Sequence, residues 1–268
     1  MYDVTATGEL LIDFTRNGLS EQNNRIYEAN PGGAPCNVLA MLGKLGYKTA
    51  FIGKVGEDEF GKLLKNTITE QKIDAAGLIL DPNAKTTLAF VDNDETGDRS
   101  FSFYRKPGAD MMLKEDEVNY ELIDNCRIFH FGSLSMTDEP VRSATYAMID
   151  YAKKKNKIIS FDPNLRPPLW ESEELAAKQI WYGIEQCDIL KIADNEIKWL
   201  TGTDDYDQGI EIIRQRTHAK LINVTLGPNG SIAYYGDHKV FMEPYLNENT
   251  IETTGAGDTF GACALHAV

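Results

Sequence analysis

The feature that most constrains the fold of this chain is a regular alternation of short apolar runs with longer stretches of helical periodicity. Strands are predicted at 2–12, 49–53, 127–131, 157–161, 188–192 and 220–225. Helices are predicted at 35–46, 57–72, 138–155, 172–186, 205–217 and from 256 onward. Because buried strands that alternate with helices pair in parallel, the pattern predicts a doubly wound, mostly parallel α/β sheet with helices on both faces.

A predicted hairpin interrupts this alternation. Residues 86–92 are strand-like, 93–98 form a polar turn, and 100–105 are strand-like again. Together with residues of about 14–30, the segment of about 86–106 predicts a small separate β-sheet that acts as a lid. No long linker or internal repeat interrupts the 268 residues, so a single α/β domain over 1–268 is expected.

Charge and composition exclude several classes of partner. The chain has 27 basic and 41 acidic residues and a net charge of -14, a field that repels nucleic acids and anionic membranes. The N-terminus lacks the pattern of a signal peptide, and no stretch approaches the roughly 18 apolar residues of a membrane helix. Because the four cysteines are far apart and form no CxxC pair, we expect a cytoplasmic protein.

The most informative segment is the glycine turn within 251–265. Gly255 and Gly257 lead directly into a helix rich in small residues, so backbone N–H groups can converge at the positive end of the helix dipole. This predicts an anion site in an acidic protein. Asp258 stands at its mouth, where a carboxylate can accept a proton from a hydroxyl that attacks a phosphoryl group. The segment therefore favours phosphoryl transfer.

Two other classes of nucleotide site also use glycine-rich turns. Gly255, Gly257 and Gly261 loosely match the spacing of a dinucleotide-binding turn, which makes an oxidoreductase a competing hypothesis. However, no second βαβ unit follows, no acidic ribose ligand lies about 20 residues further on, and Asp258 would face the pyrophosphate. The P-loop pattern GxxxxGK[ST] is absent from the chain, so a P-loop enzyme is excluded.

A family resemblance follows from these motifs. The sequence TTGAGDTF at 253–260 resembles the second signature of the ribokinase (PfkB) family of sugar kinases, and GGAPCN at 32–37 and FIGKVGEDEFG at 51–61 resemble its first region. Residues 99–110 and 161–166 are most similar to bacterial fructokinases. The resemblance implies a ribokinase-like fold and transfer of the γ-phosphoryl group of ATP to a primary hydroxyl of fructose, giving fructose 6-phosphate.

Three alternatives stay open beside fructokinase. The chain resembles kinases of other substrates, such as ribose or the sugar acid 2-keto-3-deoxygluconate, and a non-catalytic sugar-binding relative would carry many of the same residues. The resemblance also implies ATP and Mg²⁺ as cofactors, a small sugar as partner, and, from the apolar lid residues 101–104, a homodimer formed through the lid.

The resemblance assigns roles residue by residue. Asp258 matches the catalytic base, and the backbone of Gly255, Ala256 and Gly257 matches the anion hole for the γ-phosphate. The sugar-binding positions are Asp13, Gly33, Asn37, Arg105 and Arg166. The nucleotide loop is matched by Thr225, Gly227 and Gly230. Glu196 matches the glutamate of the NxxE element, which orders water and Mg²⁺ near the phosphates.

Three departures from the family pattern stand out. The asparagine of NxxE is replaced by Ala193, which puts the placement of Mg²⁺ in doubt. The acidic residue before the glycine turn is Glu252 rather than aspartate, which puts in doubt a site for a monovalent cation such as K⁺. Family members continue beyond the helix that starts at 256, so C-terminal helices are expected to be missing from this chain.

Overall fold

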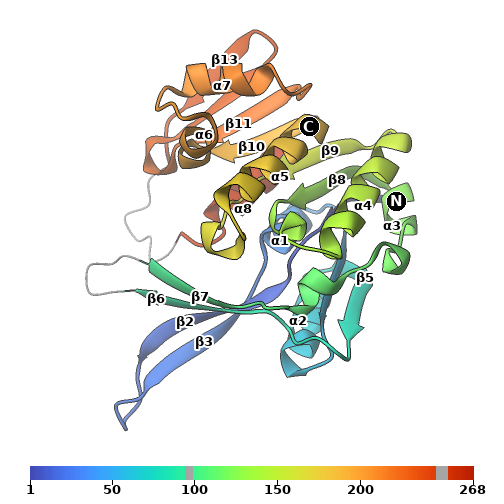
Figure 1. The fold of residues 1–268 in the computed structure, drawn as a ribbon, viewed down its shortest axis with the longest axis vertical. Coiled ribbons are helices and arrows are strands. Elements are labelled where there is room, and N and C mark those ends of the chain that lie inside the picture. Colours follow the sequence, from blue (N-terminus) through green and yellow to red (C-terminus); the bar gives the residue numbers. More distant parts are fainter. Residues whose placement is uncertain (94–98, 246–252) are drawn as a thin grey trace.

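The computed structural model describes residues 1–93, 99–245 and 253–268 and divides their strands between two sheets (Figure 1). The larger sheet has the order β13-β12-β11-β10-β9-β8-β1-β4-β5. Its strands are β1 (Tyr2–Thr7), β4 (Thr49–Gly56), β5 (Ile73–Asp81), β8 (Cys126–Gly132), β9 (Ile158–Asp162), β10 (Ile189–Ala193), β11 (Leu221–Thr225), β12 (Ser231–Tyr235) and β13 (His238–Met242). All pairs from β5 to β11 are parallel, and only β12 and β13 are antiparallel, which confirms the mostly parallel α/β fold.

Helices cover both faces of this sheet. One face carries α1 (Ala34–Lys44), α2 (Glu59–Glu70) and α8 (Ala256–His266). The other carries α3 (Glu121–Asp124), α4 (Val141–Lys154), α5 (Glu173–Gln186), α6 (Asp194–Thr201) and α7 (Tyr206–Arg214). Successive side chains of a strand point to opposite faces. In β4, Phe51 belongs to the hydrophobic core under α1, α2 and α8, whereas Ala50 and Ile52 belong to the core on the other face.

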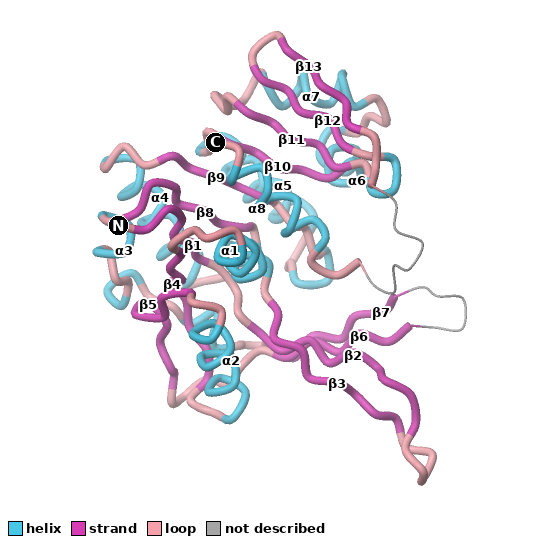
Figure 2. The backbone as a smooth tube through the Cα atoms, turned by 180° about the vertical axis from the view of Figure 1, so that it is seen from behind, coloured by secondary structure: helices cyan, strands magenta, loops and turns pink. Residues whose placement is uncertain are grey.

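The smaller sheet is the lid. It consists of β2 (Leu11–Leu19), β3 (Arg25–Gly32), β6 (Leu88–Asn93) and β7 (Arg99–Tyr104), in the order β3-β2-β6-β7. It extends away from the large sheet (Figure 2). Phe14 stacks on Phe90 at 4.8 Å, and Tyr27 meets the edge of Phe90 at 5.4 Å, so the lid has an aromatic cluster of its own. The segments of about 14–30 and 86–106 thus form one sheet, as expected; beyond Asn93, the predicted turn lies outside the described residues.

The prediction of one strand over 2–12 is wrong. The structure has two strands in different sheets, β1 and β2, separated at 8–10. Gly8 has a φ of 153°, and a Cβ there would collide with the ring of Pro35, so glycine permits the chain to leave the large sheet and enter the lid. Sequence patterns also missed β5, the β12–β13 hairpin and α6.

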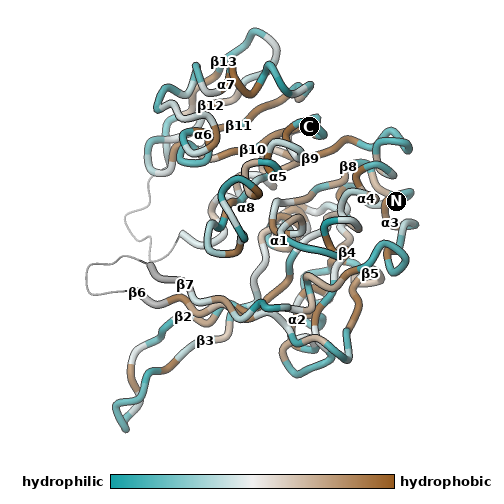
Figure 3. Tube along the Cα trace, in the orientation of Figure 1, coloured by the Kyte–Doolittle hydropathy of each residue, from teal (hydrophilic) through white to brown (hydrophobic). Residues whose placement is uncertain are grey.

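The distribution of polarity follows this architecture. Hydrophobic residues lie along the strands of the large sheet, whereas the far end of the β2–β3 hairpin is hydrophilic (Figure 3). Within the described residues, no helix combines the length and the apolar character that a bilayer span requires.

Candidate active site

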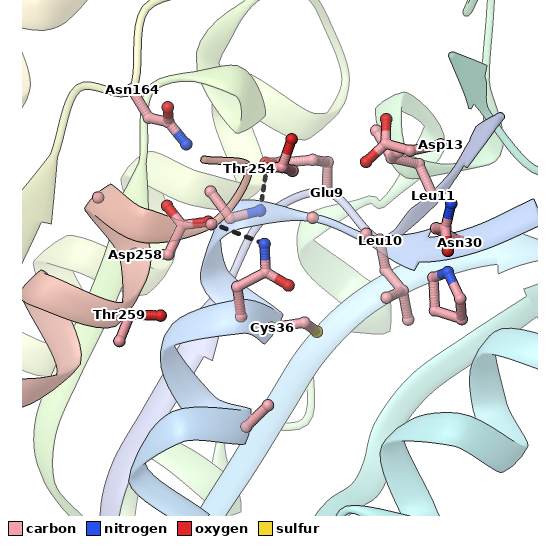
Figure 4. A pocket seen from close by; sticks show the side chains of 18 of the residues that line it. Glu9, Leu10, Leu11, Asp13, Asn30, Cys36, Asn164, Thr254, Asp258 and Thr259 are labelled. Carbon is pink, nitrogen blue, oxygen red and sulfur yellow. Dashed lines mark hydrogen bonds between the residues drawn. The ribbon is translucent and has the colours of Figure 1, made fainter. Parts of the chain in front are cut away.

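A cavity of about 580 Å³ lies between the lid and the large sheet. Asp13 and Asn30 of the lid line one side, and Asp258 of α8 lines the other (Figure 4). Asn37 of α1 also lines the cavity, beside Asp258. Asn164, in the loop that follows β9, also lines it. Open α/β sheets bind ligands at the carboxyl ends of their strands, so the cavity lies where this fold class places its sites.

The start of α1 is built around Gly33. This residue is the N-cap of α1, with a φ of 127°, and a Cβ there would collide with the backbone oxygen of Glu9. Since glycine has no side chain to cap the helix, Oε1 of Glu9 accepts the N–H of Ala34 instead, at 2.8 Å. Burial raises the pKa of Glu9 to about 7. The predicted sugar contact at Gly33 therefore places backbone, rather than a side chain, at the cavity wall.

Two predicted sugar ligands, Asp13 and Asn37, face the same cavity from opposite sides. Asp13 lies on β2 of the lid, and a Cβ on Gly32 would collide with its carboxylate, so the bare backbone of Gly32 makes room for it. Asn37 lies one turn into α1. Carboxylate and amide groups can each hold two hydroxyls, so the pair offers a polar clamp of the kind a sugar requires.

Asp258 is buried in the first turn of α8, with 8% of its surface exposed. The helix begins at Gly255, whose φ of 74° turns the chain into α8. Asn37 Nδ2 donates to Oδ2 of Asp258 at 2.8 Å (Figure 4). Burial raises the pKa of Asp258 to about 6, against the lowering effect of the Asn37 hydrogen bond and of the charges on Lys191 and Arg166. A carboxylate with such a pKa is ionised at neutral pH and suited to accept a proton.

The backbone of the glycine turn supplies donors next to this carboxylate. The first N–H groups of a helix have no acceptor within the helix. Ala256 N donates to Thr253 O at 3.1 Å, which closes the turn. Helix geometry therefore leaves the N–H groups of Gly257 and Asp258 for an anion. The N–H of Ala256, which was predicted to contact the anion, donates within the turn instead.

The two predicted arginines have different surroundings. Arg166 lines the cavity, and its charge lowers the pKa of Asp258. Its Nη1 also donates to Leu165 O at 3.1 Å. The structure thus brings Arg166, Asp13, Asn37 and Asp258 together around one cavity.

Arg105, by contrast, is not brought to this cavity. Only 3% of its side chain is exposed, and Nε contacts Oδ2 of Asp110 at 2.7 Å. Nη1 donates to Thr137 Oγ1 and Nη2 to Leu134 O, each at 2.9 Å. These partners belong to the short helical segments Ala109–Met112 and Leu134–Met136 and to Thr137, which follows the second of them, so Arg105 attaches the end of β7 to these segments, and its predicted contact with the sugar stays a prediction.

Glu196 caps the start of α6. Its Oε1 accepts the N–H of Leu165 at 2.7 Å and its Oε2 the N–H of Ala193 at 2.8 Å. Among residues 1–93, 99–245 and 253–268, no group of three or more His, Cys, Asp or Glu side chains is arranged to hold a metal ion. Both oxygens of Glu196 accept backbone N–H groups in this structure, and its metal role stays a prediction. Glu252, whose presence in place of aspartate puts a K⁺ site in doubt, lies outside the described residues.

The predicted nucleotide loop lies further along the same edge of the sheet. Thr225 ends β11, where it pairs with Ala193 of β10. Gly227 and Gly230 follow with φ values of 55° and 98°. None of the three lines the cavity around Asp258. They occupy the carboxyl end of the strand next to β10, beside rather than within the predicted sugar pocket.

Sequence reasoning missed one charged pair at the site. Lys191 Nζ lies 3.1 Å from Oδ2 of Asp162, and Lys191 lines the cavity. A signal was present, because Lys191 is the only charged residue in the apolar run 189–193 of a strand expected to be buried. Charged side chains are seldom fully buried without a partner, so a lysine in such a strand points to an acidic neighbour.

Comparison with known proteins identifies the class to which this fold and site belong. The model of the pfkB family carbohydrate kinases matches residues 1–268. The chain is 41% identical over 267 residues to "Probable fructokinase-2" of Arabidopsis thaliana, covering 99% of this chain and 81% of that protein. It is 40% identical to "Fructokinase-1" of Zea mays, covering 99% and 82%.

Solved structures agree with these relatives. Fructokinase with bound ATP from Xylella fastidiosa superposes with a TM-score of 0.90 at 31% identity, covering 100% of this chain and 81% of that one. Fructokinase from Vibrio cholerae O395 in a fructose, ADP and calcium ion bound form gives a TM-score of 0.88 at 32% identity, covering 98% and 82%. The chain belongs to the pfkB family of carbohydrate kinases. It is a sugar kinase with the ribokinase-like fold, and the four relatives compared above carry the name fructokinase.

Proposed function

We propose that this kinase transfers the γ-phosphoryl group of ATP to a primary hydroxyl of fructose and releases fructose 6-phosphate. The observation that carries the proposal is the position of Asp258, a buried carboxylate at the N-terminus of α8, in a cavity whose opposite wall is the lid residue Asp13. The names of the plant relatives and the fructose and ADP bound form of the Vibrio cholerae enzyme support fructose as the acceptor.

Proton transfer is assigned to Asp258. Asn37 holds Oδ2 of the carboxylate, so Oδ1 is the atom to which a sugar hydroxyl donates. As the bond between the sugar oxygen and the γ-phosphorus forms, the bond from that phosphorus to the β,γ-bridging oxygen breaks and ADP leaves. The hydroxyl proton passes to Asp258, and the amides of Gly257 and Asp258 stabilise the charge on the transferred group.

Binding and closure are assigned to the two walls of the cavity. Asp13 and Asn37 hold sugar hydroxyls, and Arg166 contributes a positive charge where the phosphorylated product forms. Because water competes with the sugar for the phosphoryl group, approach of the lid to the large domain favours transfer over hydrolysis of ATP.

ATP is proposed to bind at the carboxyl ends of β10 and β11, over the loop of Thr225, Gly227 and Gly230. The ATP-bound structure of the Xylella fastidiosa enzyme supports this donor. Mg²⁺ is proposed only as the ion that accompanies ATP, and no step of the reaction is assigned to it. K⁺ stays a candidate through the potassium ion bound form of the Vibrio cholerae double mutant.

Substrate choice is tested with a panel of fructose, ribose, glucose and 2-keto-3-deoxygluconate, using coupled detection of ADP. The proposal expects the highest kcat/KM for fructose, and a much better acceptor than fructose would overturn the choice of sugar. ATP titrations by calorimetry, with and without fructose, test the non-catalytic alternative. Binding of sugar without any binding of ATP would identify a sugar-binding module instead of an enzyme.

Assembly and location complete the proposal. We expect a homodimer formed through the lid, where Leu19, Ile26 and Tyr104 expose 50%, 42% and 66% of their surfaces. Sedimentation at micromolar concentration tests this, and a monomer alone would refute it. The described cysteines are unpaired, which fits a cytoplasmic location, and fractionation of the source cells is the measurement that checks it.

A further inference from the structure

We propose that Lys191 is a positioning residue for phosphoryl transfer, whose buried ammonium lies under the first turn of α8 and holds the Asp258 carboxylate in its proton-accepting form. The role of Asp258 as the base rests on the function proposed above. The action of Lys191 on Asp258, however, is a property of the free protein and is tested without any substrate.

The ammonium group of Lys191 lies between Asp162 and the glycine turn. Lys191 projects from β10, and its Nζ lies 3.3 Å and 3.1 Å from the two carboxylate oxygens of Asp162 on the neighbouring strand β9. A Cβ built on Gly257 would lie 3.1 Å from the same Nζ. The ammonium therefore lies directly against the backbone of the glycine turn, and glycine at 257 leaves the space that this approach requires.

The charge on Lys191 is maintained by its surroundings. Burial alone lowers the pKa of Lys191, but the negative charges of Asp162, Glu196 and Asp258 outweigh this effect, and the net shift is upward. The side chain is 11% exposed, so little water screens it. Lys191 is therefore a fixed positive charge at the end of the sheet where α8 begins and where the phosphoryl group is expected to bind.

The charged groups around Asp258 shift its pKa in opposite directions. Asp162 raises the pKa of Asp258, whereas Lys191 and Arg166 lower it. His130, which also faces Asp162 and Lys191, is buried, and burial lowers its pKa to about 4, so it is neutral at pH 7 and adds no positive charge. Without Lys191, the Asn37 hydrogen bond and the charge of Arg166 would remain to oppose burial and the charge of Asp162, and proton uptake by Asp258 would become easier.

A buried lysine can also serve stability alone, and the chain contains such a residue. Lys54 is 3% exposed, contacts Asp81 at 3.4 Å and Glu117 at 2.6 Å, and does not line the cavity around Asp258. Its neutralisation removes the ion pairs of another buried lysine, away from the residues that line the cavity. Lys54→Gln is therefore the matched control for Lys191→Gln.

The experiment measures the titration of Asp258 directly. Carboxyl carbons of aspartate are labelled with ¹³C, the Asp258 signal is assigned by its loss in Asp258→Asn, and its midpoint is followed by NMR in the full chain. We expect Lys191→Gln, which retains a hydrogen-bond donor for Asp162, to raise the midpoint by about one pH unit. Asp162→Asn should lower it, because that variant removes a negative charge, and Lys54→Gln should leave it unchanged.

The same variants give a kinetic readout once the wild-type enzyme has been shown to phosphorylate a sugar. A midpoint that moves from about 6 to about 7 lowers the ionised fraction about fivefold at pH 6 and hardly at all at pH 8. We therefore expect kcat/KM of Lys191→Gln to fall about fivefold at pH 6, with a much smaller loss at pH 8. A merely structural role would lower activity equally at both pH values.

The outcomes separate the two proposals. A folded Lys191→Gln protein in which the Asp258 midpoint stays within 0.3 pH unit of the wild type would overturn the role of Lys191, whatever the activity. If Lys191→Gln fails to fold, the midpoint in Asp162→Asn decides, since an upward or absent shift there contradicts the charge balance. A wild-type protein that phosphorylates no sugar would refute the proposed function while the NMR titration still decides this one.

Discussion

Replacement of Asp258 by asparagine separates two effects that the structure predicts to have opposite signs. Asparagine has nearly the same shape, and its amide oxygen can still accept the hydrogen bond from Asn37 Nδ2. The change therefore removes the negative charge and the basic group while the packing around α8 stays as it is. Catalysis should be lost, but the folded state should become more stable at neutral pH.

The size of each effect follows from the surroundings of Asp258. General-base catalysis contributes about 10²–10⁴-fold, so kcat should fall by at least about 100-fold. Burial raises the pKa from 3.8 to about 6, a shift of roughly two units that corresponds to about 3 kcal/mol against the ionised form in the folded state. This cost is absent below pH 4, grows as the pH rises towards 6, and is fully present above that value.

Two assays on the same protein test this reasoning. Initial rates with saturating ATP and fructose give kcat, and calorimetry gives the affinity for fructose, which should stay within about twofold because Asp13 and the amide of Asn37 remain. Thermal melts at pH 7.5 should place the variant several degrees above the wild type, at roughly 2–4 °C per kcal/mol. Near pH 4 the two melting temperatures should converge.

Each half of the prediction can fail separately. Retention of more than a few per cent of the wild-type rate would refute Asp258 as the base. A variant that melts below the wild type at pH 7.5, or a difference in melting temperature that does not change with pH, would show that Asp258 is not a destabilised buried carboxylate. In that case its raised pKa would not be the property that suits it to proton transfer.

Three further predictions concern neighbouring residues. Asn37→Ala removes the hydrogen bond that lowers the pKa of Asp258, so the acidic limb of kcat/KM should move above pH 6; an unmoved limb contradicts this. Gly33→Ala places a Cβ against Glu9 O, and fructose affinity measured by calorimetry should fall at least tenfold, whereas wild-type affinity would show that the backbone there can relax. Arg105→Met breaks a buried ion pair and should cost about 3–5 kcal/mol in urea unfolding. A selective rise in KM for fructose at unchanged stability would instead make Arg105 a sugar ligand.

The glycine turn illustrates what local sequence can predict. The roles predicted for Gly255 and Gly257 rest on backbone conformation and helix polarity, both of which depend on residues adjacent in the chain. The alternation of strands and helices is also local, which is why the fold class and a second, small sheet were predictable. The exception, the single strand expected over 2–12, failed because an apolar run does not reveal that its two halves belong to different sheets.

The contacts of Arg105, Glu196 and Lys191 could not be predicted from the sequence, because each depends on the tertiary fold. The partner of Arg105 is only five residues away at Asp110, but nothing local indicates that the loop between them folds the guanidinium inward. Glu196 receives a backbone amide from Leu165, 31 positions earlier, which no pattern around 193–196 contains. Lys191 and Asp162 likewise meet only because β9 and β10 are neighbours in the sheet.

The crossing between the large sheet and the lid has a consequence for how this enzyme family can diversify. The chain leaves the large sheet at Gly8 and returns at Gly33, and the hydrogen bond from Ala34 N to Glu9 joins the two crossing points at 2.8 Å. The β2–β3 hairpin is thus an excursion whose ends meet. Such a segment can be exchanged between relatives as a module, provided that it keeps its parallel pairing with β6. The wall of the pocket that contains Asp13 and Asn30 can then evolve while Asp258 and its helix remain untouched.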